Sequence, residues 1–206
     1  ISSPELTTYG ERLANEQLGG WEIARVYGTE DDHETGHFRA RIVDALDPGC
    51  GVAFFVGHGS RYMWAMAQPQ HGVINKRFTE DDVALLTNQG RYPILFTATC
   101  FSALFDAPLH YKSHSDSGIG IYFVEAADKG AIALIGHVGR SYPEHDHAFT
   151  CSVLEAMCKR GGAPRLGDAF LVAKHAHPTE QMSGMALIGD PGLSVGRYYN
   201  TREDPS

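Results

Sequence analysis

The stretch "FFVGHGSRYMW", residues 54–64, decides the fold, because an apolar run ends there abruptly at an ionisable ring. The run begins at residue 51 and is apolar throughout, which is typical of a strand buried on both faces of a parallel sheet. His58 follows it directly, between Gly57 and Gly59. Either this is ordinary turn chemistry with an incidental histidine, or His58 stands at a strand end to react. The second interpretation requires a reactive partner elsewhere in the chain.

On both sides of this stretch, apolar runs alternate with segments of helical periodicity. The expected strands are 21–28, 51–57, 92–100, 131–136 and 185–195. The expected helices are 5–18, 37–46, one that Thr79 caps with Asp82 in the reciprocal position, 118–130, 146–160, and 166–176, capped by Gly167 and Asp168. This order predicts an α/β fold, a three-layer sandwich in which helices cover both faces of a mostly parallel sheet. We expect residues 1–206 to form a single domain.

Composition narrows the class of protein. The net charge of -8 argues against a nucleic-acid partner, which requires a basic surface. No window approaches the roughly 18 apolar residues of a membrane span, so no membrane partner is expected. There is no signal segment and no initiator Met, and we expect a processed product or an excised domain. The four cysteines are sparse and irregularly spaced, so all four are expected to be reduced, with Cys151 and Cys158 in the core.

Cys100 is the candidate partner of His58, because it ends the next expected strand of the sheet. Neighbouring parallel strands lie about 4.8 Å apart, so the two residues are expected to project into one crevice. A thiolate nucleophile with an imidazole that moves protons is the chemistry of cysteine peptidases. Gly57 and Gly59 would allow a tight turn that brings amide N–H groups to a substrate carbonyl. The structural alternative is a buried core cysteine beside an incidental histidine.

These residues resemble the gingipain-like branch of the caspase-fold cysteine peptidases, clan CD. The resemblance rests on Gly57-His58-Gly59-Ser60 with Trp64, on Thr99-Cys100 with Phe105, and on "FVEAADKGAIALIG" followed by "RSY", and it spans about residues 21–195. It implies a cysteine endopeptidase in which Cys100 attacks the scissile carbonyl and His58 protonates the leaving amine. The backbone N–H groups of Gly59 and Cys100 would hold the oxyanion.

The resemblance also implies a substrate site and a location. Trp64, His137, Ser141 and Tyr142 would bind a peptide or protein substrate, although the family commonly has Trp where Tyr142 stands. Cleavage would follow a basic P1 residue, Arg or Lys. Asp31, Asp32 and Glu34 are candidates for the acid that reads it, and a solvated acidic loop is the alternative interpretation. The family points to a secreted or cell-envelope protein.

The chain departs from the family at its start. The family fold opens with a central strand and a helix before the strand at 21–28, and no apolar run precedes the first helix here. We therefore expect the sheet to lack its first strand in this chain, with an upstream segment or a partner chain completing it.

Two other functions stay open. One is a catalytically inactive caspase-like module that binds peptides or proteins. The other is a metal-binding protein, suggested by 11 histidines, but the pairs His145/His147, His175/His177 and His110/His114 fit no strong zinc pattern, so no metal site is expected. No cofactor is required. The resemblance allows structural calcium, for which "TEDDHE" (29–34) or "PEHDH" (143–147) would supply oxygen ligands.

Overall fold

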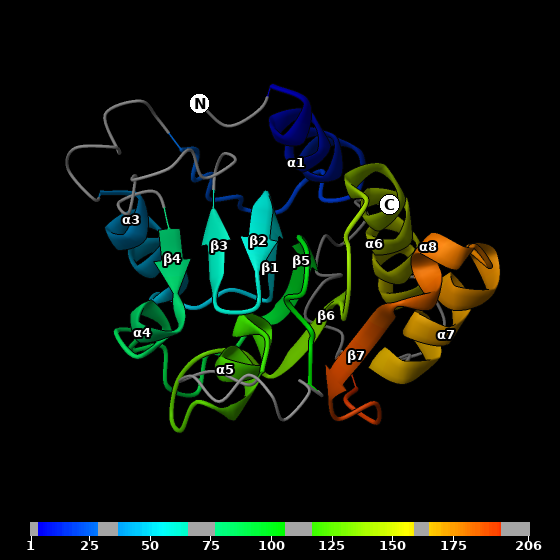
Figure 1. The fold of residues 1–206 in the computed structure, drawn as a ribbon. Coiled ribbons are helices and arrows are strands. Elements are labelled where there is room, and N and C mark those ends of the chain that lie inside the picture. Colours follow the sequence, from blue (N-terminus) through cyan, green and yellow to red (C-terminus); the bar gives the residue numbers. More distant parts are fainter. Residues whose placement is uncertain (1–3, 29–36, 66–76, 106–116, 159–164, 195–206) are drawn as a thin grey trace, which may run out of the picture.

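A four-stranded sheet lies at the centre of the computed structural model, which describes residues 4–28, 37–65, 77–105, 117–158 and 165–194 (Figure 1). Its order is β1-β5-β6-β7. The strands are β1 (Val52–Val56), β5 (Ile94–Ala98), β6 (Ala133–His137) and β7 (Met185–Gly189). The first three are parallel, and β7 runs antiparallel to β6. The mostly parallel sheet expected from the sequence is confirmed, with one antiparallel edge strand.

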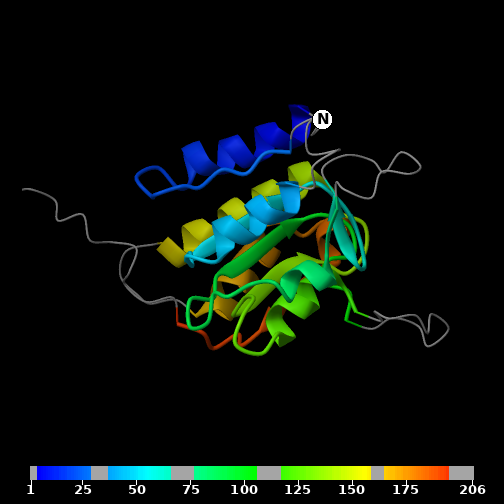
Figure 2. The ribbon, with the colours of Figure 1, turned by 90° about the vertical axis from the view of Figure 1, so that its left-hand side faces the viewer.

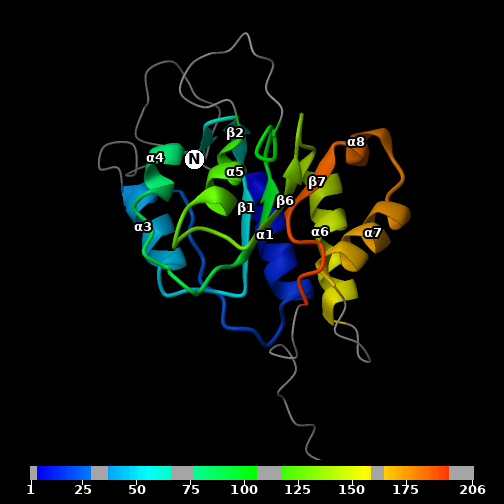
Figure 3. The same ribbon diagram turned by 90° about the horizontal axis from the view of Figure 1, so that it is seen from below.

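Helices cover both faces of this sheet. On one face lie α1 (Pro4–Glu16), α6 (Pro143–Cys158), α7 (Leu166–Ala176) and α8 (Glu180–Ser183). On the other lie α3 (His37–Leu46), α4 (Glu80–Val83) and α5 (Ile119–Glu125). Figure 2 shows α1 outermost on one side of the sheet and α5 on the opposite side, and Figure 3 shows α3 and α7 flanking the sheet. Among the described residues, no helix has the length and hydrophobicity of a membrane span.

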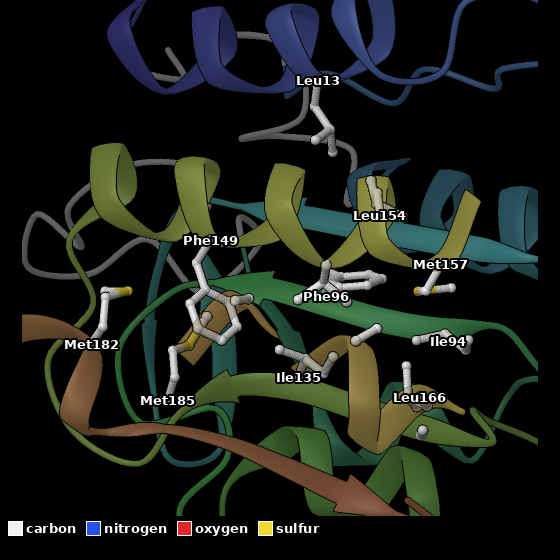
Figure 4. Close-up of a cluster of buried hydrophobic side chains, with 14 residues drawn as sticks. Leu13, Ile94, Phe96, Ile135, Phe149, Leu154, Met157, Leu166, Met182 and Met185 are labelled. Carbon is white, nitrogen blue, oxygen red and sulfur yellow. The ribbon is translucent and has the colours of Figure 1, made fainter. Parts of the chain in front are cut away.

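The core has two halves because successive residues of a strand point to opposite faces of the sheet. Ile94 and Phe96 of β5 pack against Phe149 and its neighbours on α6, as Figure 4 shows. Leu95, between them in the sequence, packs instead with Phe123 of α5 on the other face. The apolar run at 92–100 is therefore buried on both sides, as the sequence predicts.

A second, three-stranded antiparallel sheet follows β1 directly and corrects the expected turn at the Gly-His-Gly motif. It consists of β2 (His58–Ser60), β3 (Met63–Ala65) and β4 (Arg77–Thr79). Trp64 anchors it, with its ring stacked on Phe55, Phe78 and Phe123 at centroid distances of 4.5, 5.6 and 4.9 Å. His58 thus lies in a strand that a buried aromatic cluster holds in place.

The expected strand at 21–28 is not formed, and its residues are half-buried or exposed. Side-chain contacts hold this segment to the helices: Arg25 pairs with Glu11 at 3.0 Å, and Arg41 Nη2 donates to the carbonyl of Tyr27 at 2.9 Å. Among the described strands, β1 is therefore an edge strand. All five of its residues are only half-buried, although their apolar sequence is typical of a central strand.

The helix boundaries differ in detail from the expected ones. Asp82 accepts the N–H of Thr79 at 2.8 Å, which confirms the capping pair before α4. The helix expected at 146–160 already begins at Pro143. The helix α7 has Arg165 at its N-cap rather than Gly167 or Asp168, so that expected cap is wrong.

Candidate active site

His58 and Cys100 leave the central sheet side by side. Val56 and Ala98 are register partners at the ends of β1 and β5, and Gly57 N–H donates to Ala98 O at 3.3 Å. His58 lies two residues after Val56, and Cys100 lies two residues after Ala98. Both are therefore at the carboxyl edge that the parallel strands share. Both are half-buried, so neither is sealed inside the core. The two residues are far apart in the sequence, with α4 between them, and the pairing of β1 with β5 brings them to the same edge of the sheet.

Gly59 lies against the segment that leads to Cys100. A Cβ at Gly59 would overlap Thr99 Oγ1 and lie 3.1 Å from the carbonyl of Met63. Thr99 is fully buried, and its hydroxyl has no hydrogen-bond partner among the described residues. Only glycine fits between these two segments, because any side chain would push β2 away from the end of β5.

The turn after Cys100 is strained and is held from β6. Phe101 has φ 61°, a left-handed conformation that costs a non-glycine residue about 1–3 kcal/mol. Its N–H donates to Gly139 O at 2.7 Å, and Ala103 N–H donates to His137 O at 2.9 Å. Below the turn, the Ser102 hydroxyl bonds that of Thr97 at 2.6 Å. These bonds fix the backbone on which the Cys100 sulfur is carried.

The segment after β6 reaches the sulfur itself. Ser141 N–H donates to Cys100 Sγ at 3.4 Å, and Ser141 Oγ donates to Asp146 Oδ2 in a short hydrogen bond. The other carboxylate oxygen of Asp146 lies 2.9 Å from His137 Nε2, an ion pair when His137 is protonated, although the ring N–H is poorly aligned with it. A chain of contacts thus runs from the sulfur to a buried acid on α6.

Asp146 is absent from the residues that sequence reasoning selected for the site. The sequence does contain a sign of its burial, because Asp146 lies at helical spacing from Phe149, Thr150 and Val153 on one face of α6. A carboxylate on an otherwise apolar helix face needs a partner in the protein.

The structure corrects two of the four predicted substrate-binding residues. Trp64 is 2% exposed within the aromatic cluster, and His137 is 1% exposed with Nε2 facing Asp146, so neither side chain faces a substrate. Ser141 is half-buried beside Cys100, and Tyr142 is 43% exposed at the start of α6. These two can border a pocket next to the sulfur.

Some of the residues predicted to bind a basic P1 side chain or a metal ion lie in the described part of the chain, and others lie outside it. Asp31, Asp32 and Glu34, with the rest of "TEDDHE", lie outside the described residues, as do His110 and His114. In the described part of the chain, no three His, Cys, Asp or Glu side chains are grouped to hold a metal ion. Asp146 of "PEHDH" is occupied by Ser141 and His137, so this segment does not fit a calcium site, which needs six or more oxygen ligands.

All four cysteines are free thiols. Burial raises the pKa of the Cys50 thiol and of the Cys158 thiol. It also raises the pKa of Cys151, with a smaller contribution from the nearby Glu16 carboxylate. Cys151 is half-buried and packs against the core, as expected, whereas Cys158 is exposed, which corrects the expectation for that residue. These three sulfurs are held in the less reactive thiol form.

A family model and several known proteins match this chain. The model described as peptidase family C25 matches residues 5–196. An uncharacterized protein of Archaeoglobus fulgidus is 25% identical over 166 residues, which are 74% of this chain and 39% of that protein.

Two solved structures share the fold. The complex of the pro- and mature domains of RgpB from Porphyromonas gingivalis matches with a TM-score of 0.69 and 19% identity, over 90% of this chain and 43% of that one. The crystal structure of the Arg-specific cysteine proteinase gingipain R (RgpB) matches with a TM-score of 0.65 and 19% identity, over 91% and 42%. The chain therefore spans about two fifths of the length of the relatives it matches.

Proposed function

This chain belongs to peptidase family C25, and from that premise we propose that it is a cysteine endopeptidase acting through His58 and Cys100. The gingipain-like resemblance in the sequence and the α/β fold are both confirmed. The observation that carries the proposal is the register of β1 and β5, which brings His58 and Cys100 out of the sheet at equivalent positions on adjacent strands.

In the proposed reaction, the Cys100 thiol gives its proton to His58, and the resulting thiolate attacks the scissile carbonyl carbon and forms a carbon–sulfur bond. The carbonyl oxygen becomes an oxyanion, to which the backbone N–H groups of Gly59 and Cys100 donate. As the carbon–nitrogen bond breaks, His58 protonates the departing amine, and a thioester remains on the enzyme. Water then attacks the thioester, gives a proton back to His58, and releases the acid product and the sulfur. No step requires a cofactor.

We propose Arg or Lys at P1 of the substrate, with Ser141 and Tyr142 at the entrance of the pocket. The preference for Arg is proposed by analogy with the Arg-specific cysteine proteinase gingipain R, and the net charge of -8 is compatible with either basic residue. Ser141 supports this placement, because its main chain contacts the sulfur that the P1 carbonyl would approach.

The first testable prediction concerns Cys100. A peptidyl acyloxymethyl ketone with Arg at P1 is expected to label Cys100 and not the other three cysteines, as read by peptide mass spectrometry. Cys100→Ala should abolish both labelling and peptide cleavage, because the nucleophile is removed, and should leave the fold unchanged. Cys151→Ala is the matched control and should retain both.

Full activity in Cys100→Ala would rule out the mechanism. Binding of the probe peptide without labelling in the unaltered protein would favour the inactive peptide-binding module instead. An Asp or Leu probe that labels faster than the Arg probe would exclude the basic P1 preference while leaving the peptidase itself intact.

We further propose that another strand pairs with the outer edge of β1. An apolar parallel strand is normally buried on both sides, whereas all five residues of β1 are half-buried, and residues 21–28 form no ladder. One solved structure of similar fold is a complex of pro- and mature domains, which is compatible with a partner segment. A secreted or cell-envelope location is likewise a proposal, drawn from the family alone and testable by cell fractionation.

A further inference from the structure

The end of β6 and the segment after it contact the Cys100 turn at three points. Phe101 N–H donates to Gly139 O at 2.7 Å, Ala103 N–H to His137 O at 2.9 Å, and Ser141 N–H to Cys100 Sγ at 3.4 Å. The first two bonds hold the turn's backbone, whereas the third is made to the sulfur. The position of Ser141 therefore decides whether the sulfur has a main-chain donor.

Ser141 is itself held by a buried carboxylate. Its hydroxyl donates to Asp146 Oδ2, and Asp146 is fully buried. Asp146 N–H also donates to Tyr142 O at 2.9 Å, so the acid fixes this loop by its side chain and by its main chain. A charge removed from water is costly unless its oxygens are satisfied, so the Ser141 bond is strongly favoured over solvent.

His137 secures the opposite side of the carboxylate. Its Nε2 lies 2.9 Å from Asp146 Oδ1, and the ring is 1% exposed. Its other nitrogen lies near Gly184, where an added Cβ would stand 3.2 Å from Nδ1. The histidine thus lies against one carboxylate oxygen, while Ser141 bonds the other.

We propose that Asp146, oriented by His137, is a positioning residue for the nucleophile, acting through the Ser141 N–H on the sulfur of Cys100. A donor to sulfur favours its anionic form, which is the reactive one. This role deepens the proposed peptidase function and rests on it, but the contacts that carry it concern the sulfur alone. They predict a change in the reactivity of Cys100 whether or not a peptide is cleaved.

The test uses the full native chain and compares Asp146→Ala and Ser141→Ala with Asp82→Ala. Asp82 is the matched control, because it is also a fully buried carboxylate, but it binds Thr79 and Arg39 at α4 on the other face of the sheet. The readouts are the rate of Cys100 alkylation by iodoacetamide, resolved by peptide mass spectrometry, kcat and KM for a peptide substrate, and the urea midpoint.

We expect Asp146→Ala and Ser141→Ala to slow Cys100 alkylation about tenfold, the order of effect of one hydrogen bond to a charged group. The value of kcat should fall similarly in both variants, and KM should change less than twofold in Asp146→Ala, because Asp146 is fully buried and does not contact the substrate. Ser141→Thr, which keeps the hydroxyl, should restore both rates. Asp82→Ala should lower the urea midpoint without slowing alkylation of Cys100.

Alkylation of Cys100 within twofold of the unaltered rate in folded Ser141→Ala would overturn the proposal. So would an equal slowing in Asp82→Ala, since the effect would then be one of general stability. If Asp146→Ala does not fold, Ser141→Ala and Ser141→Thr still test the proposal. Ser141 is only half-buried, so these two variants are expected to fold. Slowed alkylation in a protein that cleaves no peptide would support the positioning role and reject the peptidase.

Discussion

Gly59 and Thr99 lie too close together for any side chain to be inserted between them. The carbon that alanine adds at Gly59 would overlap Thr99 Oγ1 and press on Met63 O at 3.1 Å. At this point β2 contributes only the backbone of Gly59, and the segment after β5 contributes the hydroxyl of Thr99. This clearance determines how near the Gly59 N–H group can approach the carbonyl that Cys100 would attack.

The prediction for this position is a mutant cycle. Gly59→Ala should lower the free energy of unfolding by about 1–3 kcal/mol, the usual cost of overpacking, and should reduce peptide cleavage by displacing β2. Thr99→Ala removes the overlapping oxygen, so the double variant should recover part of the lost stability. Urea denaturation of the four proteins measures the coupling.

Gly19→Ala is the control for the cycle, because its added carbon would meet nothing nearer than Asn15 O at 3.7 Å. It should be nearly neutral. Strictly additive effects of Gly59→Ala and Thr99→Ala would contradict the contact on which this prediction rests.

At the scale of elements, the strands and helices around the site are predictable because their patterns are local. The apolar runs at 51–57, 92–100 and 131–136 all form strands. The strand expected at 21–28 does not form, because strand formation depends on a partner that the local pattern cannot supply. The three-residue strands of the second sheet are too short to carry a recognisable period.

The site is predictable to a different depth. The positions of His58 and Cys100 at one edge follow from consecutive parallel strands. Trp64 and His137 were expected to bind substrate, but both are buried. Their burial depends on side chains of other helices and strands, which the local sequence does not reveal. Trp64 meets aromatic rings from β4 and α5, and His137 meets an acid from α6.

The packing of α1 on α6 carries a pH-dependent prediction. His147 on α6 is 5% exposed, faces the ring of Tyr9 on α1 at 5.7 Å, and lies 3.7 Å from Cys151 Sγ. Burial lowers the pKa of His147, the positive Arg12 lowers it further, and Glu16 partly opposes them. The folded protein therefore holds this ring neutral at a pH where an exposed histidine would be charged.

The sign follows from proton uptake. Below about pH 6.5, the usual histidine pKa, the unfolded chain binds a proton at His147 that the folded chain does not. Stability should be full above this pH and fall as the pH drops below it, by at most about 1.4 kcal/mol per pH unit from this residue. Urea midpoints at pH 7.5 and 5.5 measure the loss.

His147→Gln should show a smaller loss than the unaltered protein, since no proton is taken up at this position. The exposed His175 provides the control, and His175→Gln should keep the full pH dependence. An identical loss in His147→Gln and in the unaltered protein would exclude His147 as its source.

At the scale of the whole molecule, the site is assembled where three parallel strands end, and its last side chains come from the segment after the third. The β1 strand leads into β2, which begins with His58, Cys100 follows the end of β5, and the segment after β6 supplies Ser141. Of these strands, β5 and β6 are flanked on both sides, whereas β1 has a described neighbour only in β5. The strand that leads to the histidine is thus the one with the fewest neighbours in the described part of the sheet.

The direction of the backbone groups of β1 makes its outer edge testable. Ile94 N–H donates to Gly51 O, and Gly57 N–H donates to Ala98 O. Because main-chain groups alternate in direction along a parallel strand, Ala53 and Phe55 also point toward β5, and the N–H groups of Val52, Phe54 and Val56 point outward. No described strand pairs with these outward groups, and unpaired groups on an apolar strand are a template for another strand.

The last prediction compares residue-resolved hydrogen exchange in the native protein and in the 206 residues expressed alone. If a further strand completes the sheet, the amides of Val52, Phe54 and Val56 should be protected in the native protein and should exchange rapidly in the 206 residues. Ala53 and Phe55 are internal controls and should be protected in both, because they bond β5. Equal exchange of the outward amides in both preparations would reject the additional strand.

Loss of protection at Ala53 and Phe55 as well would instead mean that β1 detaches from the sheet without its partner. Peptide cleavage should then also be lost, because His58 lies two residues after the end of β1.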